Sequence, residues 1–143
     1  MKLHFSLGQS NLSGYVNVDV SRHQLDLANL DNICEASECT EIIVNDILKF
    51  MSYDKMPEVI QHLTSRLRHG SKITIIITDV NSIIREYSAG KVDEKELNKL
   101  LFDQGARSCF SYDYLVRILK SVHLNVLNID IQREQVVITA ERP

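Results

Sequence analysis

Hydrophobic residues along this chain follow two spacings, and the spacing changes several times between its ends. In residues 2–7 and 15–20 every second position is apolar, and a glycine follows the first run and precedes the second. Alternation of this kind, with glycine at its borders, is typical of β-strands. The chain is therefore predicted to open with two strands joined by a loop.

The middle of the chain alternates between strand and helix patterns. Residues 41–45 form a β-branched run that suits a strand, and residues 57–69 place apolar side chains at helical spacing. Pro57 fits a first helical turn, and Gly70 fits a C-terminal helix stop. Residues 72–79 are the most apolar stretch, and their continuous β-branched character predicts a central strand covered on both faces.

The last third of the chain adds helices and ends in paired strands. Residues 80–87 and 93–102 have helical patterns, and residues 111–122 begin with a serine suited to an N-cap and carry one apolar face. Residues 125–131 and 134–141 are strand-like runs joined by a short polar turn, which predicts a terminal hairpin.

Strands that alternate with helices predict an α/β fold with a mostly parallel twisted sheet, and the terminal hairpin places an antiparallel strand at or near its edge. In such sheets ligands bind beyond the carboxyl ends of the strands, at the point where the strand order reverses. The candidate residues at those ends are Ser6, Leu7, Gly8, Asp19, Asn45, Asp46 and Asp79.

Composition narrows the class of protein. A length of 143 residues is that of one ordinary domain, and 44% hydrophobic with 24% charged residues is typical of a globular protein. The net charge is −3 and the Lys and Arg residues are scattered, so nucleic acid is not an indicated partner. No signal peptide and no apolar run of membrane-spanning length is present, so we expect a cytoplasmic protein.

The cysteines and histidines do not form a metal-binding pattern. Cys34, Cys39 and Cys109 are an odd number, and no histidine stands near the first two at the spacing of a zinc site. The five histidines are dispersed along the sequence and suggest neither a metal cage nor a catalytic triad. We expect buried or free thiols and no metal.

Two residues in the opening stretch have the chemistry of a nucleoside site. Gly8 follows a strand and lets backbone approach a ligand closely, because glycine has no Cβ and adopts positive φ. Asp19 ends the next strand, and its carboxylate can accept two hydrogen bonds from a ribose diol. The two are too close in sequence to enclose the helix of a dinucleotide-binding motif, so no helix N-terminus is available for a pyrophosphate.

Residues 2–20 resemble the opening of a branch of small class I S-adenosylmethionine-dependent methyltransferases, whose pattern is K-L-N-L-G-C-G, a short loop, then P-G-W-x-N-V-D. Tyr15 stands in the place of the tryptophan, and Ser6 in that of the first glycine of G-x-G. The positions that match without a gap are Lys2, Leu3, Gly8, Gly14, Asn17, Val18 and Asp19.

The resemblance continues over nearly the whole chain. Residues 66–80 resemble the family's R-x-L-K-P-G-G-x-L-x-I-x-x-P-D segment, and residues 85–102 resemble its Y-x-x-G helix-loop-helix insertion. Residues 112–129 resemble its penultimate helix and sixth strand. The resemblance implies a Rossmann-like methyltransferase fold in one domain, residues 1–143, with a sheet flanked by helices and an insertion of short helices at about residues 80–110.

The resemblance also implies a cofactor and a set of site residues. S-adenosylmethionine is the expected cofactor, and a small molecule or another, unknown compound is the methyl acceptor. Asp46 or Asp79 would polarise the nucleophile, although Asp46 would equally suit a helix N-cap. The cofactor-binding residues that the resemblance implies are Ser6, Gly8, Asp19, Asp26 and Asn45.

Several positions depart from the family's pattern. Ser6 adds a Cβ where the family brings backbone against the cofactor, Lys49 and Phe50 stand in place of a Glu-His pair, and Thr78 replaces a proline. The leading hypothesis is a methyltransferase. The alternatives are a catalytically inactive methyltransferase-like binding module and, third, a dinucleotide-dependent oxidoreductase.

Overall fold

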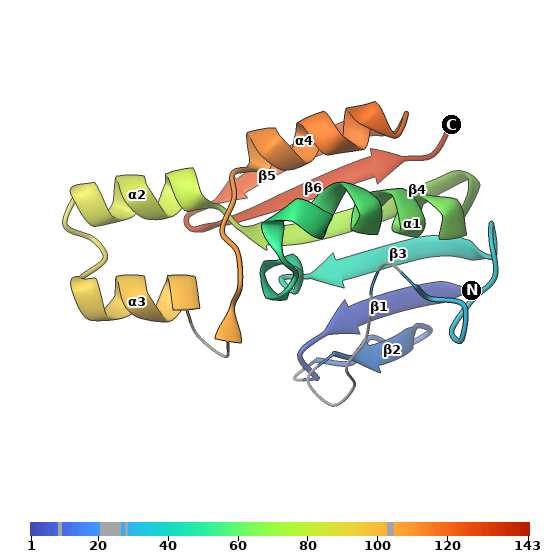
Figure 1. The fold of residues 1–143 in the computed structure, drawn as a ribbon, viewed down its shortest axis with the longest axis horizontal. Coiled ribbons are helices and arrows are strands. Elements are labelled where there is room, and N and C mark those ends of the chain that lie inside the picture. Colours follow the sequence, from blue (N-terminus) through green and yellow to red (C-terminus); the bar gives the residue numbers. More distant parts are fainter. Residues whose placement is uncertain (9, 21–26, 28, 103–104) are drawn as a thin grey trace.

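The protein is built on one six-stranded sheet in the order β2-β1-β3-β4-β6-β5 (Figure 1). The computed structural model describes residues 1–8, 10–20, 27, 29–102 and 105–143. The first four strands are parallel, and β6 is antiparallel to both β4 and β5. The fold class predicted from the sequence is therefore confirmed. The strands are β1 Lys2–Ser6, β2 Val16–Asp19, β3 Cys39–Asn45, β4 Leu67–Thr78, β5 Asn125–Gln132 and β6 Gln135–Glu141.

The helices occupy two regions of the molecule. Helices α1 (Met56–Arg66) and α4 (Tyr112–Ser121) lie side by side on one face of the sheet, whereas α2 (Val80–Ser88) and α3 (Glu94–Phe102) project beyond the carboxyl ends of the parallel strands (Figure 1). Two short 3₁₀ helices, η1 (Leu48–Phe50) and η2 (Tyr53–Lys55), precede α1. None of the described helices is long and apolar enough to cross a membrane.

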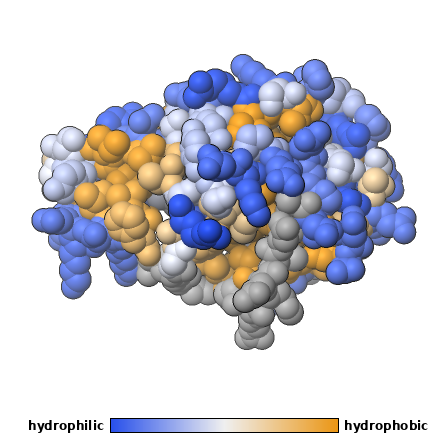
Figure 2. Space-filling model, in the orientation of Figure 1, coloured by the Kyte–Doolittle hydropathy of each residue, from blue (hydrophilic) through white to orange (hydrophobic). Residues whose placement is uncertain are grey.

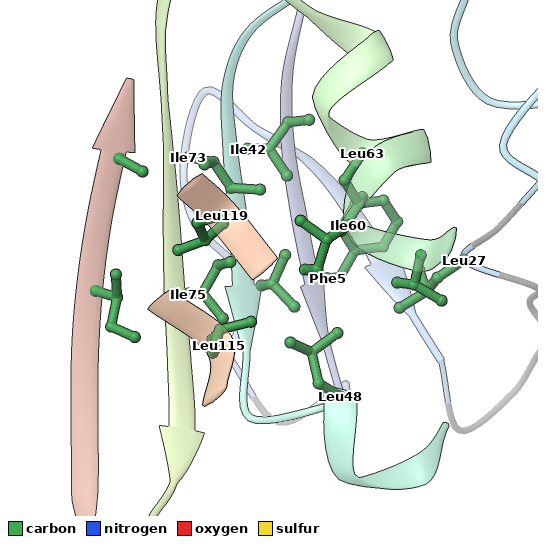
Figure 3. Packing of buried hydrophobic residues seen from close by; sticks show 14 of the residues in the cluster. Phe5, Leu27, Ile42, Leu48, Ile60, Leu63, Ile73, Ile75, Leu115 and Leu119 are labelled. Carbon is green, nitrogen blue, oxygen red and sulfur yellow. The ribbon is translucent and has the colours of Figure 1, made fainter. Parts of the chain in front are cut away.

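The hydrophobic core lies between the sheet and the pair α1 and α4 (Figure 3). Strands β3, β4 and β6 send every second side chain to this face, and both helices present a stripe of Leu and Ile toward it. Full burial of each such side chain stabilises the fold by about 1.5–3 kcal/mol as an upper estimate. The residues that meet there include Phe5, Ile42, Ile73 and Ile75 from the sheet, and Ile60, Leu63, Leu115 and Leu119 from the helices.

The predicted helix over residues 57–69 is three residues too long. Helix α1 ends at Arg66, and β4 begins at the next residue, Leu67, which is fully buried and pairs with Cys39. Gly70 is not a helix stop. It lies within β4 at φ +82°, where the pairing with β3 is irregular, and its amide donates to the Arg142 carbonyl at 2.6 Å. A glycine at positive φ suits a strand bulge as well as a helix terminus, which explains the error.

The prediction that residues 72–79 are covered on both faces is also wrong. Ile73, Ile75 and Ile77 are buried against the helices, whereas Thr74 and Ile76, which point to the other face, are partly exposed. The same alternation holds along β3 and β6. In the described part of the chain no helix covers the second face over β3, β4 and β6, because α1 and α4 both lie on the first (Figure 1).

Candidate functional site

The strand order reverses beside β1, which lies between β2 and β3. Ser6 is the register partner of Asp19, and the pairing of Phe5 with Val44 places Asn45 beside Ser6 on its other side. Three predicted site residues that are far apart in the sequence therefore lie together at the carboxyl edge of the sheet. This is the position at which open α/β sheets bind ligands.

Gly8 and Asp19 are in direct contact at this edge. Gly8 has φ +82°, and a Cβ built on it would lie 2.2 Å from Asp19 Oδ2. Any residue other than glycine would therefore be strained in its backbone and would collide with the carboxylate. At this point Gly8 presents no side chain to Asp19, the only acidic residue of β2.

Ser6 occupies the floor of this loop. Its side chain is 5% exposed, and its hydroxyl accepts a hydrogen bond from the Gly8 amide at 3.1 Å. The Ser6 carbonyl accepts another from the Val20 amide at 2.9 Å. Ser6 therefore links the ends of β1 and β2 and directs the Gly8 N–H toward its own side chain.

Asn17 holds the chain between β1 and β2 against the sheet. Its side-chain oxygen accepts from the Leu12 amide at 2.9 Å and lies 2.9 Å from Nδ1 of the buried His4, while its amide group donates to the Leu12 carbonyl at 3.0 Å. Tyr15, at the end of this segment, is hydrogen-bonded to Glu41, which together with burial raises the pKa of Tyr15 to about 12. The segment that positions Gly8 is thus fastened to both β1 and β3.

A second polar cluster lies where β3 and β4 end. Asp46 has the uncommon backbone angle φ +54° for a residue with a side chain. Its carboxylate accepts a hydrogen bond from Thr78 Oγ1 at 2.9 Å and forms an ion pair with Lys49 Nζ at 3.0 Å. Asp46 does not cap a helix, because η1 has Ile47 at its N-cap position and no side-chain cap. Backbone strain of this kind concentrates at functional sites.

The cluster forms one wall of an open cleft of ≈ 530 Å³. Helix α3 and the turn between β5 and β6 form the other walls, and Figure 2 shows hydrophobic surface at this end of the molecule, over α2 and α3. The amides of Arg107 and Ser108 both donate to the Lys49 carbonyl, at 2.7 and 3.0 Å, and so fix the segment after α3 to the cluster. The cleft is lined by Asp46, Lys49, Thr78, Asp93, Lys95, Glu96, Lys99, Leu100, Glu134 and Gln135.

Asp79, the other candidate for polarising a nucleophile, is fully buried. One carboxylate oxygen accepts from the Ser82 amide at 2.9 Å and from the Ser82 hydroxyl at 2.8 Å, and the other accepts from the Tyr112 amide at 2.7 Å. Asp79 therefore caps α2 and ties it to the start of α4. This environment favours a structural role over contact with a substrate.

Sequence reasoning found some of these residues and missed the role of others. Asp26 lies outside the described residues. Lys49 and Thr78 stood out in the sequence only as departures from a family pattern, and their meeting with Asp46 depends on the register of β3 against β4. The three-residue spacing from Asp46 to Lys49, combined with a short helical turn, is the one sequence signal that could have linked two of them.

The fold is that of class I methyltransferases. A Methanosarcina mazei S-adenosylmethionine-dependent methyltransferase has a TM-score of 0.59 and 12% identity, with 82% of this chain and 65% of that chain covered. A Burkholderia thailandensis 1,6-didemethyltoxoflavin-N1-methyltransferase with bound S-adenosylhomocysteine has a TM-score of 0.58 and 14% identity, with 88% and 50% covered. A Pyrococcus horikoshii OT3 protein has a TM-score of 0.72 and 11% identity, with 99% and 81% covered.

These similarities are ones of fold, since no family model and no curated protein sequence matches the chain. The chain spans 30% to 65% of the length of three of the matching structures, all described as methyltransferases or members of a methyltransferase family.

Proposed function

We propose that this protein is an S-adenosylmethionine-dependent methyltransferase, which binds the cofactor at the carboxyl ends of β1 and β2 and a methyl acceptor in the cleft beside Asp46. The observation that carries the proposal is the contact between Gly8 and Asp19, in which a Cβ on Gly8 would lie 2.2 Å from the carboxylate. The bare backbone of Gly8 thus lies beside the Asp19 carboxylate, which can bind a ribose diol, at the switch point of the sheet.

Each residue at the edge has a distinct part in this proposal. Asp19 accepts hydrogen bonds from the ribose hydroxyls, and Gly8, which has no Cβ, leaves room for the Asp19 carboxylate at the end of the loop. Asn45, beside Ser6, is placed to meet the methionine portion, and Asp26 is assigned to the adenine side by resemblance alone.

The cofactor supplies a methyl group already activated on a sulfonium, so the protein contributes mainly by aligning the two reactants. The cleft of ≈ 530 Å³ begins at the carboxyl ends of β3 and β4, two strands from Asp19. Asp46 lines it and can accept a proton or a hydrogen bond from a hydroxyl or amine acceptor, because each carboxylate oxygen accepts more than one hydrogen bond. Lys49 Nζ, 3.0 Å from Asp46 Oδ2, orients that carboxylate.

Dinucleotide-dependent oxidation is the weaker proposal on this geometry. Within residues 1–8 and 10–20, the chain passes from β1 to β2 without a helix, so no helix N-terminus faces the site. A pyrophosphate would lack the donors that such a terminus provides. A cofactor without phosphates is unaffected by this absence.

The alternative of a binding module that does not use the cofactor rests on Ser6. Its hydroxyl accepts the hydrogen bond of the Gly8 amide, which that amide could otherwise donate to a cofactor carboxylate. The Ser6→Gly variant releases that amide, and we expect it to bind S-adenosylhomocysteine at least as tightly as the natural chain. Binding that is lost in Ser6→Gly would contradict the placement of the cofactor.

Crystals soaked with S-adenosylhomocysteine test the proposal directly. We expect density for the ribose within hydrogen-bond distance of Asp19 and density for the amino-acid portion beside Ser6 and Asn45. A parallel soak with NAD provides the comparison. Clear NAD density with no S-adenosylhomocysteine density, or S-adenosylhomocysteine bound away from Asp19, would overturn it.

A further inference from the structure

The second face of the sheet, the one turned away from α1 and α4, carries a consistent pattern across β3, β4 and β6. Every side chain on it from these strands is partly or fully exposed, whereas the alternating residues on the first face are buried. All-parallel sheets are almost always covered on both faces, and β3 and β4 are parallel strands whose second face is exposed here. We name this surface the open face and define it by Glu41, Ile43, Lys72, Thr74, Ile76, Val137, Thr139 and Glu141.

The open face has an apolar centre and a charged border. Ile76 and Val137 are register partners in the middle of the face, and Thr74 and Thr139 form the next pair along the same two strands. The pair after that is Lys72 and Glu141, at the edge. From the centre to the edge of the face, β-branched side chains thus give way to opposite charges, as in a small interface core with a polar rim.

We propose that a second copy of this chain covers the open face, packing sheet against sheet about a two-fold axis that runs parallel to the strands between β4 and β6. The inference does not depend on the proposed methyltransferase activity. A two-fold axis brings a surface against itself, so the surface must be complementary to its own rotated image.

Rotation about this axis exchanges the places of β4 and β6. Ile76 then faces the partner's Val137, Thr74 faces the partner's Thr139, and Lys72 faces the partner's Glu141, each contact occurring twice. The charges therefore meet with opposite signs, and the apolar side chains meet in the centre. The strands of two packed sheets are usually rotated by about 30° relative to each other. These pairs lie nearest the axis, so that rotation moves them least from their facing positions.

The outer strands fit the same arrangement. Rotation places the partner's β5 over β3, so Glu41 faces the partner's Asn125, and Ile43 faces the partner's Asn128. An amide opposite a carboxylate can donate a hydrogen bond to it. None of the facing positions on these four strands pairs two like charges, which would cost affinity.

The area of the open face approaches that of a specific dimer. Four strands about 4.8 Å apart, each with about seven residues at about 3.3 Å, give a flat footprint of roughly 440 Å² per protomer. Two footprints approach the total of about 1,000 Å² that marks a specific interface, before side-chain relief is counted. A dimer that paired through the exposed edge of β5 would, in contrast, bury only one strand of each protomer.

The test is the mass of the purified protein in solution, measured by sedimentation equilibrium over a range of concentrations. We expect a monomer–dimer equilibrium, with the dissociation constant raised at least about 100-fold in Ile76→Lys, because this substitution buries an unpaired charge at the centre. Lys120→Glu, on the exposed side of α4, is the matched control and leaves the equilibrium unchanged. Circular dichroism confirms that each variant is folded.

A charge exchange tests the orientation of the two copies. We expect Lys72→Glu to weaken the dimer and the double variant Lys72→Glu/Glu141→Lys to restore it. A protein that is monomeric at every concentration overturns the proposal. A dimer that persists in Ile76→Lys and is lost in Ile131→Lys, on the edge strand β5, overturns it as well.

Discussion

The Asp19 carboxylate lies against the Cα of Gly8, so that a Cβ on Gly8 would be 2.2 Å from Asp19 Oδ2. Two segments that are separate strand ends in the sequence thus share one small volume at the switch point of the sheet. The substitution Gly8→Ala should be far more damaging than a typical substitution at a turn glycine, because the added methyl group displaces the carboxylate. We expect a loss of about 2–4 kcal/mol in the free energy of unfolding, from backbone strain and from displacement of the Asp19 side chain together.

Gly14→Ala is the matched control for Gly8→Ala. Gly14 has nearly the same backbone angle, φ +84°, but nothing lies within 4 Å of its added Cβ. It should show only the strain of about 1–2 kcal/mol. Denaturant unfolding measures both variants, and Gly8→Ala in an Asp19→Ala background should cost about as much as Gly14→Ala. Equal losses for Gly8→Ala and Gly14→Ala in the natural background would refute the contact.

Asp79→Ala should destabilise the fold strongly. The substitution leaves the Ser82 amide, the Ser82 hydroxyl and the Tyr112 amide without their acceptor in a buried site. A loss of about 3–5 kcal/mol is expected, whereas Asp113→Ala, at an exposed position of α4, should cost less than about 1 kcal/mol. Thermal unfolding distinguishes the two. A stable Asp79→Ala protein that binds cofactor normally but lacks activity would show that Asp79 is catalytic instead.

Asp46→Asn should leave stability nearly unchanged and lower methyl transfer. Asparagine tolerates positive φ and still accepts the Thr78 hydrogen bond, so only the ion pair with Lys49 is lost. Such a pair, about 20% exposed on each side, contributes at most about 1 kcal/mol. A fall of about 100-fold in turnover is expected for loss of a general base. Asp54→Asn, in exposed η2, is the control, and equal turnover for both variants would remove Asp46 from the reaction.

The three cysteines should differ in reactivity. Cys109 is exposed, whereas Cys34 and Cys39 are buried, and burial raises the pKa of both buried thiols, that of Cys39 to about 12. A chromogenic disulfide reagent at pH 8 should therefore modify one thiol rapidly, and Cys109→Ser should abolish that phase. Rapid reaction of two or three thiols in the native protein would contradict the burial.

The same thiols make stability depend on alkaline pH. Cys39 binds its proton more tightly in the folded state than in the unfolded state, where its pKa is near 9.0. Its contribution is therefore complete below about pH 9 and is lost as the pH rises from about 9 toward 12. Denaturant unfolding at pH 8 and pH 10.5 should show a smaller decrease for Cys39→Ala than for the natural chain. An equal decrease would show that the thiol does not contribute.

Local patterns in the sequence predicted the order of strands and helices, because alternation and helical spacing reflect the single core that Phe5 and Ile60 share. They misplaced the end of α1, since the positive φ of Gly70 serves a strand bulge as readily as a helix terminus. They also could not show that Ile76 faces an open side of the sheet, because a β-branched run has the same composition whether one face or both are covered.

The sequence predicts site residues that lie at the ends of strands. It does not predict contacts that depend on which residues of neighbouring strands pair. Gly8 and Asp19 each end a strand pattern, so their position at one edge follows from a parallel sheet. The meeting of Asp46 with Thr78 depends on which residues of β3 and β4 pair, and no local pattern specifies that pairing.

Titration calorimetry with S-adenosylhomocysteine tests the central claim most directly, with the natural chain and its Asp19→Ala variant measured side by side. The natural chain should bind one equivalent with a measurable heat, and Asp19→Ala should bind at least about 10-fold more weakly, because the ribose hydroxyls lose a charged acceptor. Circular dichroism confirms that the variant is folded. Absence of binding by the natural chain, or equal affinity in both proteins, would contradict the proposed cofactor site.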